Sequence, residues 1–263
     1  SFGISEEFRL TREAFVDYYK HLNHGGYLSI TLYFLPPART ELRLLSTINS
    51  AMKEIGINDT HRKISVIRSW NTVTILFKNG ELQQEEIAGI RKFARDRNFD
   101  IVYYPGIREA ESNIFNKLPN NDYFRIVSGI MDPVEYEAAV EGYLFDIAPV
   151  TDERPFFNNF LRVKNIFETY RLAGNKWQYF LEEGYLIPII LIQAIALSAL
   201  LILLPLFKKG RRVVFSLQVF IYFSSIGLGF MFLEIAIIQK FILYLDNPIY
   251  AVTVVIAAIL LSS

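Results

Sequence analysis

The chain has 263 residues, with 27 lysine and arginine residues balanced by 27 aspartate and glutamate residues, no cysteine, and 52% hydrophobic residues. This length suits one large domain or two smaller ones, and the apolar content excludes a disordered chain. The absence of cysteine excludes a disulfide scaffold, a thiolate zinc site and a cysteine nucleophile. A net charge of zero argues against a nucleic-acid partner, because nucleic-acid binders need excess cations to displace counterions from phosphates.

The charges are unevenly distributed along the chain. Residues 185–263 carry five cationic and two anionic side chains, which leaves 22 cations and 25 anions for residues 1–184. The first part therefore has the composition of a soluble domain, and the second has that of a lipid-embedded segment. Because the chain begins with Ser1 rather than Met and ends directly after the apolar run 249–261, we expect it to be a piece of a longer protein.

Residues 1–106 show alternating helix and strand signals. Thr11 suits the N-cap of a helix that ends before Gly25-Gly26, and the run 27–34 is rich in β-formers. Apolar residues then recur at helical spacing over 42–55, and Gly56 follows as a C-terminal cap. Helix, strand and helix in this order are typical of an α/β sheet.

A hairpin follows this unit. Two β-rich runs, 63–68 and 72–78, are separated by three residues, which is the length of a hairpin loop. We expect this antiparallel pairing to close the edge of an otherwise parallel sheet. A helical pattern over 87–94 and a strand over 99–104 complete the predicted α/β domain, 1–106.

Residues 107–184 give weaker signals. The segment Asp132-Pro133-Val134-Glu135 has the cap, first-turn proline and acidic third residue of a helix start. The segment 146–157 is typical of a loop with a hydrophobic end. We interpret 107–184 as an irregular, partly helical extension and connector.

Three apolar stretches make up the rest of the chain. Residues 185–207 lack any charge, and their helix would be about 35 Å long, enough to cross a hydrocarbon core of about 30 Å. This predicts a transmembrane helix preceded by an aromatic belt. After the basic turn 208–212, a second membrane helix is predicted over 213–245, which spans as far as Leu233 and then continues along or out of the interface. The last stretch, 249–263, is too short to span, and we interpret it as a truncated transmembrane helix.

Glu234 lies within this apolar part. If the second span starts beside Arg212, about 21 residues bring the chain back to the opposite interface by Glu234. We therefore favour an interfacial or helix-contact role for this carboxylate over a proton or ion role. A transporter would need polar groups at the bilayer midplane, and this counting places none there.

Several blocks of the sequence carry a resemblance to a known family. The first block is Phe8 to Asn79, which includes Gly25-Gly26-Tyr27-Leu28 and Phe34-Leu35-Pro36-Pro37. The second is the segment 146–157, which reads Asp-Ile-Ala-Pro-Val-Thr-Asp-Glu-Arg-Pro-Phe-Phe. The third combines Gly227-Leu228-Gly229-Phe230 with Ile238-Gln239-Lys240-Phe241. Together they resemble the bacterial membrane-bound spermidine synthase-like proteins, in which a class I methyltransferase-type domain is flanked by transmembrane helices. The resemblance covers nearly the whole chain and implies the C-terminal half of a Rossmann-type sheet.

The resemblance also implies a chemistry. The parent protein would use S-adenosylmethionine or decarboxylated S-adenosylmethionine, either to move an aminopropyl group to a polyamine or to move a methyl group to another acceptor. In this family the glycine-rich turn, the acidic residue for the ribose and the acidic residue that faces the amine precede the point where this sequence begins, and no G-x-G-x-x-G occurs in it. We therefore expect this piece to hold no cofactor and to be inactive alone. Its implied partners are the upstream half of its own domain, further membrane helices, the lipid bilayer and a small-molecule amine or other acceptor.

The candidate substrate site follows from the predicted sheet. In open α/β sheets, ligands bind beyond the carboxyl ends of parallel strands. For the strand 27–34 this end includes Thr31, Tyr33, Phe34 and Pro36, which we expect to line the acceptor side of the pocket in the intact enzyme. Ordinary core packing of an aromatic strand end explains these residues equally well.

Other polar groups favour structural roles. His21 and His24 stand one helical turn apart, a spacing that can hold a metal, but no carboxylate is spaced to complete a site, and cationic side chains favour a helix C-terminus. His61 is expected to face solvent. The segment 152–154, Asp-Glu-Arg, offers an acid and a base, but an ion-paired loop that clamps the domain to the membrane helix is the favoured interpretation.

Two hypotheses for function stay open. Either the parent is an active transferase, in which carboxylates hold an amine in line with the sulfonium carbon and accept its proton, or the fold is a non-catalytic scaffold or ligand sensor coupled to the membrane helices. We expect a bacterial inner-membrane protein. The cations at 208–212 favour an external soluble domain by the positive-inside rule, whereas the cytoplasmic supply of S-adenosylmethionine favours an internal one, and we favour the internal placement.

Overall fold

The computed structural model describes residues 5–165, 171, 186–208, 217–245 and 248–262. The chain divides into two compact units, Ser1–Ala194 and Ile195–Ser263, and each is considered by itself. The predicted aromatic belt at 177–185 and most of the basic turn 208–212 lie outside the described residues.

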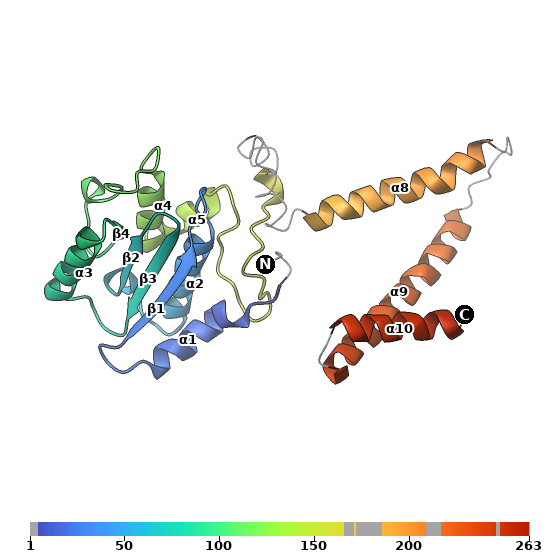
Figure 1. Cartoon of the computed structure of the whole chain (residues 1–263), viewed down its shortest axis with the longest axis horizontal. Coiled ribbons are helices and arrows are strands. Elements are labelled where there is room, and N and C mark those ends of the chain that lie inside the picture. Colours follow the sequence, from blue (N-terminus) through green and yellow to red (C-terminus); the bar gives the residue numbers. More distant parts are fainter. Residues whose placement is uncertain (1–4, 166–170, 172–185, 209–216, 246–247, 263) are drawn as a thin grey trace. The chain divides into compact units, whose positions relative to one another are not determined.

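A single four-stranded sheet forms the centre of the first unit (Figure 1). Its strands are β1 (Tyr27–Tyr33), β2 (Ile64–Arg68), β3 (Thr72–Lys78) and β4 (Asp100–Tyr103), in the spatial order β1-β3-β2-β4. All three strand pairs are antiparallel, and the β2–β4 pairing is irregular between Val66 and Ile67. The unit is therefore α/β, as predicted.

The prediction that the sheet is parallel apart from one edge hairpin is wrong. β1 and β2 run in the same direction, but they do not pair, because β3 lies between them. The short loop between β2 and β3 requires these two strands to pair in the antiparallel sense. β3 also pairs with β1 on its other side and therefore lies between the two strands that run in the same direction. β4 then joins the free edge of β2 in the antiparallel sense.

Two helices cover one face of the sheet. α1 (Arg12–His21) begins at Thr11, whose hydroxyl accepts a hydrogen bond from the Ala14 amide at 3.3 Å, as the N-cap prediction requires. α2 (Thr40–Glu54) follows β1 and packs against α1. The core between helices and sheet contains fully buried side chains from all of these elements, among them Phe15, Leu42, Leu45, Ile48, Ile75 and Phe77.

A third helix lies by the opposite face. α3 (Gln84–Asp96) starts with a capping box formed by Gln83 and Glu86. Leu82, Ile87 and Tyr104 form a separate small apolar cluster beside it. Because this cluster lies on the β4 side, the outer faces of β1 and β3 have little cover, and the odd-numbered side chains of β1 from Tyr27 to Tyr33 are exposed.

The segment after β4 shares the main core. α4 (Asp122–Met131), which the sequence analysis does not predict, and α5 (Tyr136–Gly142) contribute buried residues to it, and so does the loop 145–160. The Asp132 carboxylate accepts hydrogen bonds from the amides of Val134 at 2.8 Å and Glu135 at 3.4 Å, as a cap does, although the regular part of α5 begins only at Tyr136. Short 3-10 helices occupy Phe8–Leu10, Thr60–Arg62, Glu109–Glu111 and Val163–Asn165.

Arg43 fixes the loop 145–160 to α2. Its buried guanidinium donates hydrogen bonds to the carbonyl oxygens of Phe157 at 2.9 Å and Asn159 at 2.6 Å, and to those of Asp146 and Phe156. The predicted boundary at residue 106 therefore has no counterpart in the described core, which extends to Phe160.

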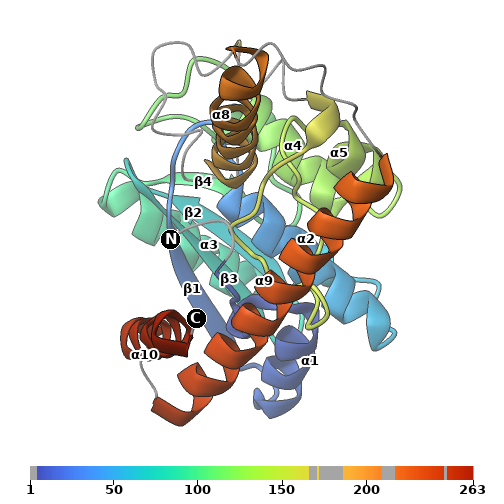
Figure 2. The same ribbon diagram turned by 90° about the vertical axis from the view of Figure 1, so that its right-hand side faces the viewer.

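Long apolar helices follow. α8 (Leu186–Lys208) matches the predicted helix 185–207, α9 (Leu217–Leu245) continues through the predicted interfacial extension, and α10 (Pro248–Ser262) folds back against α9 (Figures 1 and 2). Among the described residues, Ile221–Ile242 of α9 is the stretch long and apolar enough to cross a membrane, and the apolar stretches described in α8 and α10 are shorter.

Glu234 is a residue of α9. It lies within the candidate span Ile221–Ile242, and the residues 213–216, with which the predicted span begins, lie outside the described residues. On α9, the half-buried residues include Glu234, Ile237 and Ile238, which share one side of the helix. α10 contacts α9 and buries Ala251 and Val255, and the interfacial or helix-contact role of Glu234 stays a prediction.

Candidate ligand-binding site

The four predicted substrate residues do not share one surface. Thr31 and Tyr33 lie on the open outer face of β1, where the Thr31 hydroxyl is 2.9 Å from that of Thr74 and Tyr33 is 76% exposed. Phe34 is buried on the other side, and Pro36 lies in an exposed turn before a cis peptide bond to Pro37. Alternation along the strand separates Tyr33 from Phe34. The binding role of these residues stays a prediction.

The antiparallel sheet changes what the carboxyl end of β1 adjoins. Thr72, the first residue of β3, lies opposite Tyr33 in the register, so the carboxyl end of one strand adjoins the amino end of the next. The rule that places ligands beyond the carboxyl ends of strands applies to neighbouring parallel strands. It therefore does not apply to this pair.

A buried charged cluster fills the space beyond the core side of β1. The Phe34 ring lies 5.0 Å from the Tyr123 ring and 5.2 Å from the Arg68 guanidinium. Arg68 donates a hydrogen bond to Asp100 at 3.0 Å, and both side chains are almost fully buried. Glu41, at the start of α2, completes the cluster. The sequence did not reveal this cluster, because its five residues come from five separated segments of the chain.

Asp100 is the most strongly held member of this cluster. Its carboxylate accepts hydrogen bonds from three consecutive backbone amides, those of Ile114, Phe115 and Asn116, at 2.6, 2.8 and 2.8 Å. With the Arg68 hydrogen bond, this satisfies both oxygens. The residue therefore acts as an anchor that fixes the loop after β4.

Glu41 is held differently. Burial raises the pKa of the Glu41 carboxyl to about 7, although hydrogen bonding and the charge of Arg39 oppose the shift. The Tyr123 hydroxyl is among the groups that oppose the shift, and it is itself buried beside Glu41. A carboxyl with this pKa can exchange a proton at neutral pH, but Glu41 is only 1% exposed and lines none of the cavities described, so it is closed to a substrate.

The largest cavity described is a groove on the open face of the sheet. It has a volume of about 670 Å³, within the range of small-molecule sites. Ile90 and Phe93 of α3, with Phe99, form an apolar wall, and hydroxyl groups project from the sheet opposite it, those of Tyr27, Ser29, Ser69, Thr72 and Thr74. This combination suits a ligand with an apolar body and hydrogen-bonding ends.

Glu86 closes one end of this groove. Its carboxylate accepts hydrogen bonds from Lys78 Nζ at 2.6 and 2.7 Å, from the Tyr27 hydroxyl at 2.6 Å and from the Gln83 amide at 2.7 Å. Although desolvation acts in the opposite direction, these hydrogen bonds lower the pKa of Glu86 to about 2. The Glu86 carboxylate is therefore charged, and both of its oxygens already accept hydrogen bonds from the protein.

The other candidate groups have structural positions. His21 is exposed and its Nδ1 atom lies 2.7 Å from the Asp17 carbonyl oxygen, and no metal-binding cluster occurs among the described residues. His61 is half-buried. The segment 152–154 forms a turn attached to α1 by a hydrogen bond from the Asp152 amide to Glu13 at 3.0 Å. Its side chains form no ion pair within the described part of the chain.

The residues described do not fit an S-adenosylmethionine-type cofactor. The sequence contains no glycine-rich turn of the expected pattern, and Glu86, the carboxylate in the groove, is engaged by Lys78, Tyr27 and Gln83 and so is not free to hold a ribose diol. Comparison with protein-family models, curated proteins and solved structures yields no match.

Proposed function

We propose that this chain is the C-terminal part of a membrane-anchored transferase that uses an S-adenosylmethionine-type cofactor to transfer an aminopropyl or methyl group. The sequence resemblance suggests the reaction class. The structural observation that supports it is the open edge of β1. Because this chain does not fit the cofactor, its proposed part is to bind the acceptor, and the cofactor would be held by other residues of the parent.

β1 is a regular strand of seven residues at the edge of the described sheet. It pairs with β3 over all seven of its residues, and no strand among the described residues pairs with its other edge. Long, regular edge strands are usually shortened, bulged or covered, because their free backbone groups invite pairing. The resemblance implies that further strands of the sheet carry the cofactor motif, and β1 has the free edge that such strands need.

The groove beside β1 supplies a surface for the acceptor. Its apolar wall suits the methylene chain of a polyamine, and the hydroxyl oxygens of Ser29, Thr72 and Thr74 can accept hydrogen bonds from ammonium groups. Thr31 and Tyr33 extend the same face beyond the groove. These residues would position the acceptor toward the open edge of β1.

The proposal is tested by transfer activity of the full parent chain. The chain, with the sequence that precedes it in its gene, is reconstituted in nanodiscs with labelled decarboxylated S-adenosylmethionine or S-adenosylmethionine, and label is followed into putrescine and other acceptors. Tyr33→Phe should raise the acceptor KM about 3- to 10-fold by removing one hydrogen bond. Tyr18→Phe removes a hydroxyl from α1 and should leave KM unchanged. Absence of both transfer and cofactor binding would contradict the proposal.

A non-catalytic scaffold or ligand sensor coupled to the membrane helices is the second candidate. The filled space at the end of β1 favours it, because Phe34, Arg68 and Tyr123 occupy the region where an acceptor would meet the reacting centre in a parallel sheet. A sensor would bind its ligand in the groove without turnover. Saturable binding of an amine with no product formed by the parent chain would favour this candidate.

A further inference from the structure

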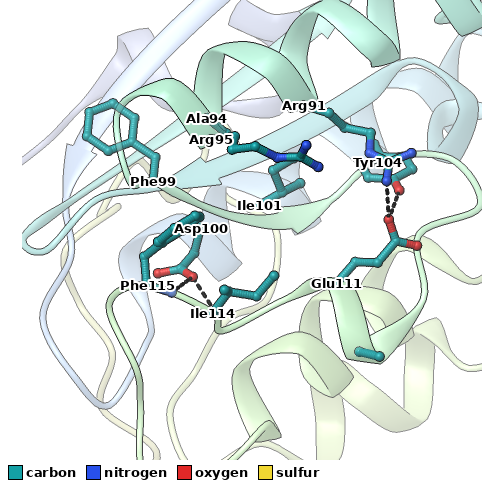
Figure 3. Close-up of a pocket in the computed structure, with 11 residues that line it drawn as sticks. Arg91, Ala94, Arg95, Phe99, Asp100, Ile101, Tyr104, Glu111, Ile114 and Phe115 are labelled. Atoms are coloured by element: carbon teal, nitrogen blue, oxygen red, sulfur yellow. Dashed lines mark hydrogen bonds and ion pairs between the residues drawn. The ribbon is translucent and has the colours of Figure 1, made fainter.

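A second, smaller cavity lies on the other side of α3 from the groove. It has a volume of about 170 Å³ and is enclosed by α3, β4 and the segment 110–115 (Figure 3). Ala94, Ile101 and Phe115 provide apolar surface. Arg91 and Arg95, one turn apart on α3, stand along its side.

The walls of this cavity are held rigidly. Asp100 accepts hydrogen bonds from the amides of Ile114 and Phe115, which fixes the segment that faces α3. On the other side, Glu111 accepts a hydrogen bond from the Tyr104 hydroxyl at 2.7 Å and pairs with Arg91 at 3.1 Å (Figure 3). A site fixed in this way loses little entropy when a ligand binds.

The charges around the opening are unbalanced. Arg91 and Arg108 both pair with Glu111, and Arg95 lines the same cavity as Glu111. The other lining carboxylate, Asp100, is paired with the buried Arg68. Glu111 already receives hydrogen bonds from Tyr104 and Arg108. Arg95 has no hydrogen bond or ion pair from its guanidinium within the described part of the chain, and Figure 3 shows it extending over Ile101.

We propose that this cavity binds a small organic carboxylate about the size of one ring, with the apolar part against Ile101 and Phe115 and the carboxylate on Arg95. The volume matches this size, since a cavity of about 150 Å³ accommodates a benzene molecule. A free guanidinium offers two parallel N–H groups to a carboxylate. This site is separate from the acceptor groove and does not depend on the transferase function.

The test uses 4-fluorobenzoate as the probe and the 263-residue chain in phosphatidylcholine nanodiscs. Fluorine NMR should show saturable binding with a dissociation constant on the order of 1 mM, as expected for so small a ligand. Arg95→Gln should weaken binding at least about tenfold, because it removes the charge-assisted hydrogen bonds. Ala110→Phe, which places a ring at the exposed wall of the cavity, should abolish it.

Matched controls separate this site from general attraction. Lys92→Gln removes a neighbouring positive charge of α3 outside the cavity and should leave the dissociation constant within about twofold. The neutral 4-fluorobenzamide should bind at least about tenfold more weakly than the benzoate. Equal effects of Lys92→Gln and Arg95→Gln, equal binding of the two probes, or unchanged binding in Ala110→Phe would each overturn the proposal.

Discussion

At the scale of single residues, Glu41 links a buried position to a measurable pH effect. Its pKa is about 7 in the folded chain, against 4.5 when exposed. Between these values the folded state holds a proton that the unfolded state has lost, so stability falls as pH rises from 4.5 to 7, by about 3 kcal/mol in total. Glu41→Gln should remove this slope. The measurement is the thermal midpoint of the nanodisc-bound chain from pH 4.5 to 8.

A comparison of variants makes this prediction specific. Glu54→Gln, an exposed carboxylate of the same helix paired with Arg12, should leave the slope unchanged. A slope that survives in Glu41→Gln would show that another group titrates in this window. Carboxylates with lowered pKa values, such as Glu13 and Glu86, titrate below it.

Asp100 gives the second prediction at this scale. Asp100→Asn keeps the shape of the side chain but leaves the buried Arg68 without its counter-charge, and one oxygen that accepts backbone hydrogen bonds is lost. Breaking a buried ion pair in this way should cost about 3–5 kcal/mol of folding stability. Hydrogen exchange should also accelerate in the segment 112–117. Exchange unchanged from the parent chain would show that the amides of Ile114 and Phe115 do not depend on this anchor.

At the scale of elements, Glu86 joins α3 to the sheet. Glu86→Ala removes the capping-box contact to Gln83, the Lys78 ion pair and the Tyr27 hydrogen bond together. We expect a loss of about 1–2 kcal/mol and faster hydrogen exchange over 84–96, because the helix loses its attachment to β1 and β3. The neighbouring Glu85→Ala changes an exposed first-turn carboxylate and should have little effect. Equal exchange in both variants would disprove this attachment.

The elements themselves were largely predictable because their signals are local. Thr11 caps α1, and Gly56, in the left-handed conformation with φ of +81°, follows α2, as their sequence positions indicate. The pairing of strands was not predictable in the same way, since it joins segments far apart in the chain. The alternation of Leu28, Ile30 and Leu32 with polar residues was the available signal for a half-exposed antiparallel strand.

The candidate site was less predictable than the fold. Side chains alternate between the two faces of a strand, so Thr31 and Tyr33 could be predicted to share one face of β1. The same alternation places Phe34 on the opposite face. Arg68 and Asp100 meet only through the β2–β4 pairing, and Asp100 holds a loop that begins a dozen residues later. No spacing rule along the sequence identifies such a cluster. The charged residues at its centre therefore required the three-dimensional structure.

At the scale of the whole molecule, the chain joins a part with the composition of a soluble domain, 1–184, to a part with the composition of a lipid-embedded segment, 185–263. The α/β unit has a closed core, whereas most described side chains of α8, α9 and α10 are apolar and exposed, which a bilayer would cover. We therefore propose that the chain is an integral membrane protein. The positive-inside rule, applied to the four cations within 208–212, places the α/β unit outside the cell, whereas the supply of cofactor places it in the cytoplasm.

A pair of single-cysteine variants decides between these two sides, because the chain has no other cysteine. We expect the α/β unit in the cytoplasm, since a cofactor-dependent domain outside the cell would lack its cofactor, and further helices of the parent can override the charge bias. In spheroplasts that express the parent chain, with any cysteine outside these 263 residues replaced by serine, an impermeant maleimide should then label Gly210→Cys but not Val134→Cys, which is 90% exposed on the α/β unit. Carbonate extraction should leave both variants in the membrane pellet. The reverse labelling pattern would place the α/β unit outside the cell. That result would favour the scaffold or sensor hypothesis over the transferase hypothesis.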